Sequence, residues 1–320
     1  MRGCIVAWRL RAALVGLCAL LVAAAPALTG AAAHAEGLRS WGVSMPGVPG
    51  DLNGLQALAE ATGRAPAEVM WYAAWATVPD FPAADAARVA ATGALPQVTW
   101  EPWDPSRGLR QSTYSLASIA AGKHDRYLAR WADQVRAYGG PLVLRLAHEM
   151  NGSWYPWAEG VNGNKAGSYV KAWRHVHDVF AARGVHNVLW AWSPNVPYPG
   201  STAFAGLYPG DAYVDRVALD GYNWADLQAG STWQSFAEVF GAGITQLQAL
   251  TSRPLFIGEV GCPEQGGDKA AWVRDMFATL AERPEIRGVV WFDHAKEADW
   301  RVDSSPASLA AFREGLASYS

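Results

Sequence analysis

Residues 141–152 read PLVLRLAHEMNG, an apolar run interrupted only by Arg145 that ends in His148, Glu149 and Asn151. An apolar run of this length is typical of a buried β-strand. In α/β barrels the active site lies at the C-terminal ends of the strands. If the fold is such a barrel, this stretch places the His148 and Glu149 side chains at its mouth.

Seven more short β-rich runs occur along the chain, and helical patterns lie between most of them. The eight runs are Ser40–Met45, Val69–Trp75, Leu95–Trp103, Pro141–Glu149, Asn187–Ser193, Val214–Trp224, Pro254–Gly261 and Ile286–Asp293. Apolar side chains fall on one face of Arg126–Tyr138 and of Tyr169–Phe180. Ser231–Leu250 and Asp268–Arg283 are further helical patterns, and Ser305-Pro306 begins a last one.

The alternation of strands and helices predicts an α/β fold of the (β/α)8 TIM-barrel type. Eight β–α units suit a barrel in a chain of this length, although no clear helix is evident in residues 194–211. A doubly wound open sheet is the alternative. It would usually begin with a glycine-rich phosphate loop after the first strand, and residues 46–50, PGVPG, lack that pattern. We therefore expect a single-domain barrel.

The first 35 residues have the order of a secretory signal peptide. Arg2, Arg9 and Arg11 precede the apolar run Ala12–Ala25, and small residues follow as far as Ala35. A membrane anchor is the alternative, but an anchor needs about 20 apolar residues and this run is shorter. We expect cleavage after Ala35, secretion without membrane attachment, and a barrel domain over residues 36–320.

Composition excludes several classes of protein. With 51% hydrophobic and 17% charged residues, the chain is too apolar to be disordered. Three cysteines exclude a disulfide scaffold, and a net charge of −3 implies no nucleic-acid partner. Only Cys262 remains after signal cleavage, and without an obvious histidine partner we expect a buried apolar thiol rather than a nucleophile. We expect a monomer.

Seventeen tryptophans are an unusual number for this length. Nine lie at or just past predicted strand ends: Trp75, Trp100, Trp103, Trp154, Trp157, Trp190, Trp192, Trp224 and Trp291. An aromatic rim at the barrel mouth would suit sugars, whose C–H faces stack on indoles. The alternative is that aromatic residues simply suit strands. Four tryptophans fall on helices and are expected in the core: Trp131, Trp173, Trp233 and Trp272.

A second carboxylate lies near the end of the seventh predicted strand. Residues 256–261, FIGEVG, are apolar except for Glu259, and Gly258 beside it lets other groups approach closely. Glu149 and Glu259 would therefore project into one cavity from opposite sides. Such a pair suits glycoside cleavage, with one acid as proton donor and the other attacking or stabilising the cationic carbon. The alternative is a structural ion pair with Arg145 or a lysine.

One segment resembles a known family closely. Residues 148–157, HEMNGSWYPW, preceded by Arg145, resemble the acid/base segment of glycoside hydrolase family 26, which includes secreted endo-β-1,4-mannanases. Gly258-Glu259 resembles the nucleophile strand of that family. Further similar segments are Ser193-Pro194-Asn195, Asp220–Trp224, and Trp291-Phe292 with Lys296 and Asp299-Trp300. The first three strands match the family only in spacing.

The resemblance implies two catalytic and four substrate-binding residues. Glu149 would be general acid and then general base, and Glu259 the nucleophile of a retaining double displacement. His148 would hydrogen-bond in the subsite of the reacting sugar. The other three roles are Trp154 as a wall of that subsite, Tyr222 as a hydrogen-bond donor to Glu259, and Trp291 as a platform beneath the sugar. No cofactor and no metal is expected.

Other polar residues near the predicted mouth are expected to have structural roles or to leave two roles open. We expect Arg145 to be an ion-pair partner inside the barrel, and Asp220 to form hydrogen bonds in a loop. Glu101 could contact substrate or cap its loop. The charged segment after the last strand, with Asp293, His294, Lys296 and Asp299, is expected to be solvated or self-paired.

The expected substrate is a β-linked polysaccharide or oligosaccharide, β-1,4-mannan first. The family resemblance also covers β-1,3-xylanases and mixed-linkage β-glucanases, and sequence does not distinguish them. A sugar-binding barrel that has lost catalysis is a hypothesis of another class, although both Glu149 and Glu259 are present. A metal-dependent hydrolase using His148 is weaker, because no second histidine follows at metal-ligand spacing.

Overall fold

The computed structural model describes residues 39–319, in which eight parallel strands close into a barrel. The strands are β1 (Ser40–Ser44), β2 (Glu68–Ala74), β3 (Leu95–Glu101), β4 (Leu142–Leu146), β5 (Val188–Trp192), β6 (Arg216–Tyr222), β7 (Leu255–Gly261) and β8 (Ile286–Phe292). Each strand pairs with the next, and β8 closes the ring on β1 with Ser40 opposite Gly288. The predicted barrel is confirmed.

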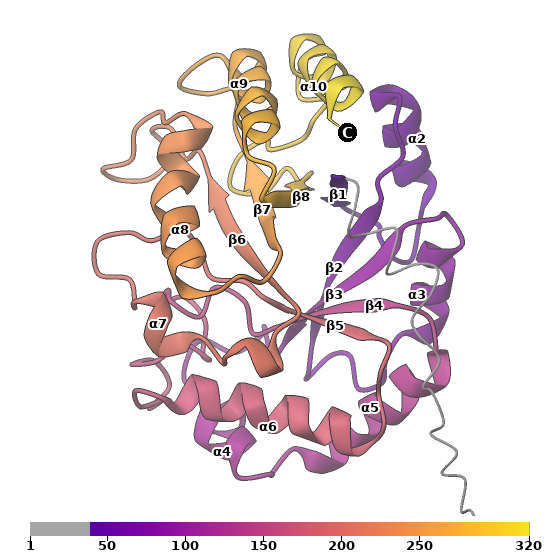
Figure 1. Cartoon of the computed structure of the whole chain (residues 1–320), viewed down its shortest axis with the longest axis vertical. Helices are drawn as coiled ribbons and strands as arrows, with labels where there is room; N and C mark the ends of the chain where they lie inside the picture. The colour runs from indigo at the N-terminus through magenta and orange to yellow at the C-terminus, as the bar shows by residue number, and fades with distance from the viewer. Residues whose placement is uncertain (1–38, 320) are drawn as a thin grey trace, which may run out of the picture.

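Helices surround this barrel (Figure 1). They are α2 (Asn53–Thr62), α3 (Ala83–Ala90), α4 (Leu116–Ala120), α5 (Asp125–Tyr138), α6 (Ser168–Ala182), α7 (Phe204–Leu207), α8 (Phe236–Leu250), α9 (Lys269–Glu282) and α10 (Pro306–Ser318). Short 3-10 turns lie at Ser112–Tyr114 and Asp211–Tyr213. The α-helix in the link between β5 and β6 is the four-residue α7, which is too short to show a helical period. This explains why residues 194–211 gave no pattern.

The late helices begin where a side chain satisfies their free N–H groups. Ser235 and Glu238 form a reciprocal capping box, so α8 begins at Phe236 rather than at the expected Ser231. Asp268 accepts a hydrogen bond from the Ala271 N–H at the start of α9. Ser305 does the same for α10, which has a proline in its first turn.

Alternation along the strands separates an apolar layer from a polar barrel interior. Side chains facing the helices form the core; Trp100, for example, stacks on Trp131 of α5 with ring centroids 4.6 Å apart. Inside the barrel, Arg216 contacts Glu68 with N–O distances of 2.6 and 2.8 Å. Because the interior holds ion pairs, it can fix the charged groups of a site above it.

The predicted aromatic rim is largely wrong. Six of its nine tryptophans are buried: Trp75, Trp100, Trp157, Trp190, Trp192 and Trp291. Those within strands lie on the faces that pack against helices, so strand preference and core packing explain them. Trp103 and Trp224 are half-buried, and Trp154 is exposed. Of the four helical tryptophans expected in the core, Trp233 is only half-buried.

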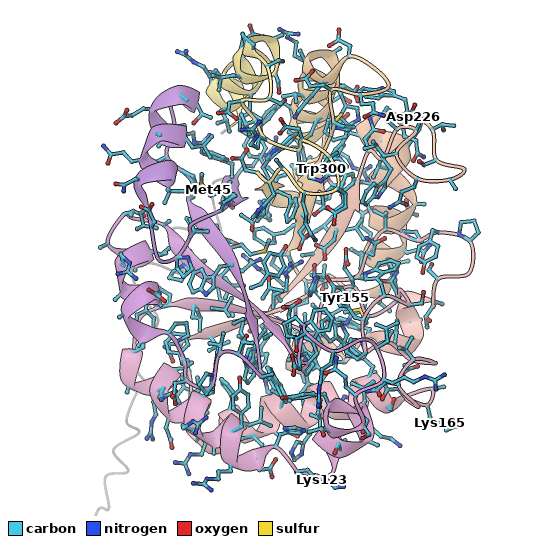
Figure 2. All side chains as sticks on the ribbon, turned by 180° about the vertical axis from the view of Figure 1, so that it is seen from behind. Met45, Lys123, Tyr155, Lys165, Asp226 and Trp300 are labelled. Atoms are coloured by element: carbon cyan, nitrogen blue, oxygen red, sulfur yellow. The ribbon has the colours of Figure 1, made fainter. Side chains whose placement is uncertain are left out.

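Loops that follow the strands cover the face seen in Figure 2. Tyr155, after β4, and Trp300, after β8, lie inside the ring of helices there, whereas Lys123 and Asp226 lie toward its edge. No helix within residues 39–319 is long and apolar enough to cross a membrane. The expected signal peptide over residues 1–35 lies outside the described residues.

Candidate active site

The backbone after β4 adopts an uncommon conformation that positions Glu149. Ala147 and Glu149 have positive φ angles of 45° and 52°, a left-handed conformation that costs roughly 1–2 kcal/mol for residues with a side chain. Neighbouring elements hold it in place. The Ala147 N–H donates to the Trp100 carbonyl at 2.9 Å, and the Glu149 N–H donates to the Ser193 carbonyl at 2.7 Å. Contacts from β3 and from the end of β5 thus fix the direction of the Glu149 side chain.

The Glu149 carboxyl group is buried and receives two hydrogen bonds. Asn195 Nδ2 donates to Oε1 at 2.9 Å, and Trp154 Nε1 donates to Oε2 at 2.7 Å. Burial and the negative charge of Glu259 nevertheless raise the pKa of Glu149 to about 7. The group therefore holds its proton in mildly acidic solution, as a general acid requires.

Glu259 faces the same site but has the opposite electrostatic character. Burial alone would raise its pKa, but the Arg145 guanidinium above all, with hydrogen bonds from Tyr222 and Tyr72 among the smaller contributions, holds it at about 2. Tyr72 Oη donates to Oε1 at 2.7 Å, Tyr222 Oη donates to Oε2, and Arg145 pairs with Oε1. The carboxylate is therefore ionised and fixed from three sides. The predicted hydrogen bond from Tyr222 is confirmed.

A β-bulge at Gly258 brings Glu259 to this position. The register between β6 and β7 passes from Leu219–Ile257 directly to Asp220–Glu259, so Gly258 is an extra residue in β7. A Cβ atom on Gly258 would overlap Asp220 Oδ1 and lie 2.9 Å from Ser193 Oγ. The expectation that this glycine permits close approach is confirmed, since only a residue without a side chain fits here.

Arg145 and Asp220 form a buried network beneath the two glutamates. Arg145 Nη1 lies 2.8 Å from Asp220 Oδ2, and Arg145 Nε donates to Thr99 Oγ1 at 2.9 Å. Ser193 Oγ donates to Asp220 Oδ1 at 2.7 Å. The expected ion-pair role of Arg145 is confirmed. Asp220 differs from the expectation, because it belongs to β6 and forms a buried ion pair rather than loop hydrogen bonds.

His148 is buried next to the acid and packs among aromatic rings. Its ring centroid lies 4.8 Å from that of Tyr155 and 5.9 Å from that of Tyr72. Burial and the nearby Arg145 charge keep its pKa well below the ordinary value, so the imidazole is neutral. Nδ1 has no hydrogen-bond partner within residues 39–319. A contact between His148 and a sugar hydroxyl stays a prediction.

Trp291 corrects one expectation about the substrate platform. Its indole lies on the helix-facing side of β8, edge-on to Phe312 of α10 at 5.3 Å, and its Nε1 donates to the Trp300 carbonyl. The neighbouring Phe292 has the opposite orientation and lies 5.6 Å from the Tyr222 ring. Strand alternation therefore gives Phe292, and not Trp291, the face toward the site, and Trp291 cannot be a platform beneath a sugar.

Trp300 is a second aromatic residue near the site on this side. Its ring centroid lies 5.1 Å from that of Tyr222 and 5.2 Å from that of Trp224. Two residues of the charged segment after β8 are self-paired, as expected: Asp299 pairs with Arg301 at 2.6 Å, and Lys296 with Glu297 at 2.9 Å. The other two differ from the expectation, because Asp293 is buried and accepts the Val302 N–H, and His294 Nε2 lies 3.1 Å from Ser44 Oγ of β1.

Sequence reasoning missed two residues that contact the carboxyl groups. Tyr72 lies in the middle of β2 among apolar residues, and only strand alternation could have marked it as facing the barrel interior. Asn195 lies in a segment that resembles the family, but no role was assigned to it. Glu101, whose role was left open, ends β3 as a buried group, and burial raises its pKa to about 7.

Neither a metal centre nor a reactive thiol is evident in residues 39–319. No group of three or more His, Cys, Asp or Glu side chains in this part of the chain is arranged to hold a metal ion. Cys262 is buried, and burial raises the pKa of its thiol to about 12. Asn223 Nδ2 donates to its sulfur at 3.4 Å. Cys262 is therefore the inert buried thiol that was expected.

The chain is similar in sequence to known glycoside hydrolases. Residues 112–262 match the sequence model of the family described as Glycosyl hydrolase family 26. Endoglucanase H of Acetivibrio thermocellus is 39% identical over 273 residues, which cover 82% of this chain and 29% of that protein. A mannan endo-1,4-beta-mannosidase of Bacillus subtilis is 29% identical over 155 residues, 45% of this chain and 38% of that protein. The chain thus spans well under half the length of these relatives.

Solved structures share the fold at low sequence identity. A GH26 beta-mannanase from Bacteroides ovatus superimposes with a TM-score of 0.67 at 19% identity, over 89% of this chain and 90% of that one. An endo-beta-1,4-mannanase from Cellulomonas fimi gives a TM-score of 0.67 at 19% identity, over 89% of this chain and 72% of that one. At such identity the likeness supports the barrel fold alone.

Proposed function

The chain belongs to glycosyl hydrolase family 26, and we propose that it is a retaining glycoside hydrolase that cleaves a β-linked polysaccharide. The observation that carries this proposal is the contrast between two buried carboxyl groups in one site: Glu259 pairs with the Arg145 guanidinium, whereas Glu149 receives its hydrogen bonds from the neutral groups of Asn195 and Trp154. Glu149 has a pKa of about 7 and Glu259 a pKa of about 2. Between these values one carboxyl is protonated and the other ionised, which assigns the acid and the nucleophile.

In the first step, Glu259 attacks the anomeric carbon while Glu149 protonates the glycosidic oxygen. The bond between that carbon and that oxygen breaks, the sugar chain on the leaving side departs as an alcohol, and a glycosyl ester forms on Glu259. Arg145 and the phenols of Tyr72 and Tyr222 keep the nucleophile aimed and ionised before attack.

In the second step, Glu149 acts as a base because it has given up its proton. It takes a proton from water, the water oxygen attacks the anomeric carbon, and Glu259 leaves as a carboxylate. Two inversions at the same carbon retain its configuration. The hydrogen bonds from Asn195 and Trp154 stabilise the Glu149 anion between the steps.

A purely structural ion pair would explain less of this arrangement. Arg145 already has a buried partner in Asp220, so Glu259 is a second carboxylate on one guanidinium. Glu149 lies beside them with no salt-bridge partner among residues 39–319 and with a raised pKa, which costs stability. Sites that store such unfavourable electrostatics are typical of catalysis. A sugar-binding barrel would gain nothing from the pair.

The substrate class comes from the relatives. Several of them are named as mannan endo-hydrolases, so β-1,4-mannan is the first candidate. Mixed-linkage or other β-glucan is the second, because the match to Endoglucanase H covers far more of this chain than the mannanase matches do. The match covers only 29% of Endoglucanase H, so the name of that protein is weaker support for glucan than the several mannanase names are for mannan. The signal peptide expected over residues 1–35 would export the enzyme to such substrates.

The test is reducing-sugar release from galactomannan, mixed-linkage β-glucan and β-1,3-xylan. We expect the wild type to release sugar from at least one polysaccharide and Glu259→Ala to lose this activity. The matched control Glu60→Ala, which changes an exposed residue on helix α2, should keep full activity. Proton NMR should detect the β-anomer as the first product. Absence of product from all three polysaccharides, an α-anomer, or full loss of activity after exhaustive chelation would contradict the proposal.

A further inference from the structure

Two exposed aromatic rings stack on each other beside the candidate acid. The ring centroids of Trp154 and Tyr198 lie 5.8 Å apart with an interplanar angle of 30°. Their side chains are 40% and 37% exposed, and within residues 39–319 only Leu109 is a comparably exposed large apolar residue. Together the two open aromatic faces offer a flat apolar surface of the kind on which ligands bind.

Both rings are held close to Glu149 by loops that contact its carboxyl group. Trp154 donates its indole N–H to Glu149 Oε2 at 2.7 Å. Tyr198 belongs to the loop after β5, whose Asn195 donates to the other Glu149 oxygen. The same loop is tied to Asn151 by its Thr202 N–H, at 3.0 Å. The pair is therefore held in a fixed position relative to the acid.

The contacts of the two glutamates indicate on which side of the cleaved bond the aromatic pair lies. Glu259 is bound by Arg145, Tyr72 and Tyr222, whereas the Trp154 and Tyr198 rings have contacts with Glu149 and its loop. In a retaining mechanism the nucleophile contacts the anomeric carbon, and the acid contacts the oxygen of the departing sugar. Sugar units beyond the acid therefore belong to the leaving chain.

We propose that Tyr198, stacked on Trp154, extends the binding surface for the polysaccharide on the leaving-group side, beyond the first departing sugar. This inference rests on the function proposed above. The ligand is a β-linked pyranose unit, whose C–H face fits a flat aromatic ring. Tyr198 does not touch the reacting atoms, so it is a specificity-determining residue and not a catalytic one.

The first experiment compares Tyr198→Ala with Tyr198→Phe, which keeps the ring. The readout is kcat/KM on the polysaccharide and on a 4-nitrophenyl β-disaccharide of the same sugar, which carries no leaving chain. We expect kcat/KM on the polysaccharide, divided by kcat/KM on the aryl disaccharide, to fall about tenfold in Tyr198→Ala. In Tyr198→Phe this ratio should stay near the wild-type value. Transfer of the glycosyl group to an added disaccharide acceptor should fall in parallel. An equal loss on both substrates, or no change on either, would overturn the inference.

A binding measurement separates this inference from the proposed function. In a Glu259→Ala background, the affinity for a hexasaccharide of the candidate polysaccharide can be measured without turnover. Tryptophan fluorescence detects the binding. Tyr198→Ala should weaken binding about tenfold there, with an unchanged melting temperature. If the wild type hydrolyses its polysaccharide but Tyr198→Ala binds normally, the inference fails and the function stands. If no polysaccharide is cleaved yet binding still weakens, the function fails and the aromatic surface stands.

Discussion

Tyr72 Oη donates a 2.7 Å hydrogen bond to Glu259 Oε1 across the barrel interior, from β2 to β7. Tyr222 donates to the other oxygen of the same carboxylate. The phenols therefore act as a pair, and each stabilises the ionised form of the nucleophile. Resemblance to the family pointed to Tyr222 alone, whereas the geometry gives Tyr72 an equal part.

Replacing either phenol should weaken the nucleophile without disturbing the fold. Tyr72→Phe and Tyr222→Phe each remove one donor from Glu259, so its pKa should rise and kcat should fall by about tenfold. Because Glu259 must be ionised, the acidic limb of the kcat/KM profile should move to higher pH. Tyr138→Phe on α5 is the control and should leave the profile unchanged. An unshifted acidic limb in both site variants would contradict the role of the phenols.

Removal of the acid should depend on the leaving group. Glu149→Ala cannot protonate the glycosidic oxygen, so hydrolysis of the polysaccharide should fall by about 10²–10⁴-fold. A 2,4-dinitrophenyl glycoside needs little protonation, and formation of its glycosyl-enzyme should be far less affected. Burst kinetics on the aryl substrate measure that step directly. Equal losses on both substrates would mean that Glu149 is not the acid.

The pH profile of the wild type follows from the same two carboxyl groups. Polysaccharide hydrolysis should decline as pH rises through about 7, because Glu149 then loses the proton that it must donate. It should decline in acid only as Glu259, with a pKa of about 2, becomes protonated or the protein unfolds. The kcat/KM profile of the free enzyme on an oligosaccharide measures both limits. An alkaline limb below pH 5 would contradict the raised pKa.

Much of the fold could be predicted from sequence, because each strand and helix has its own local pattern. All eight strands, and helices such as α5 and α6, lie within a few residues of their expected positions. What could not be predicted is which face a strand residue takes near the end of a strand. Trp291 and Phe292 are adjacent aromatic residues, and composition alone does not say which of them faces the site.

The site was predictable where a carboxylate follows or interrupts an apolar run, as Glu149 and Glu259 do. Most of the donors that bind these carboxyl groups come from other strands and loops, and no local pattern links Tyr72 to Glu259 or Asn195 to Glu149. Such pairings depend on barrel register, including the bulge at Gly258, which only coordinates reveal.

Gly258 should not tolerate a methyl group. In Gly258→Ala the new Cβ would overlap Asp220 Oδ1 and crowd Ser193 Oγ, so the Arg145 network or the bulge must shift. We expect a lower melting temperature and a loss of activity of at least about 100-fold, since small displacements of catalytic groups are costly. Gly241→Ala in α8, where no atom lies within 4 Å of the new Cβ, is the control and should keep full activity. Wild-type activity in Gly258→Ala would contradict this account of the bulge.

The acid should also reduce the stability of the folded protein at high pH. The pKa of Glu149 is raised from 4.5 to about 7 in the folded state, so the folded protein binds more protons than the unfolded chain between these values. Stability must then fall as pH rises from about 4.5 to 7, by up to about 3 kcal/mol, and the loss persists above pH 7. Glu149→Gln removes this titration while keeping the size of the side chain.

The variant should therefore gain stability relative to the wild type as pH rises, whatever its offset at pH 4. That offset includes the mismatch between a Gln amide and the donors Asn195 and Trp154, and it does not change with pH. Glu101 titrates in both proteins, so its contribution cancels from the difference. Urea unfolding of the two proteins at intervals from pH 4 to pH 8 measures the effect. If the difference in unfolding free energy stays constant across this range, Glu149 is ionised like an ordinary surface carboxylate. A group of that kind could not serve as the general acid near neutral pH.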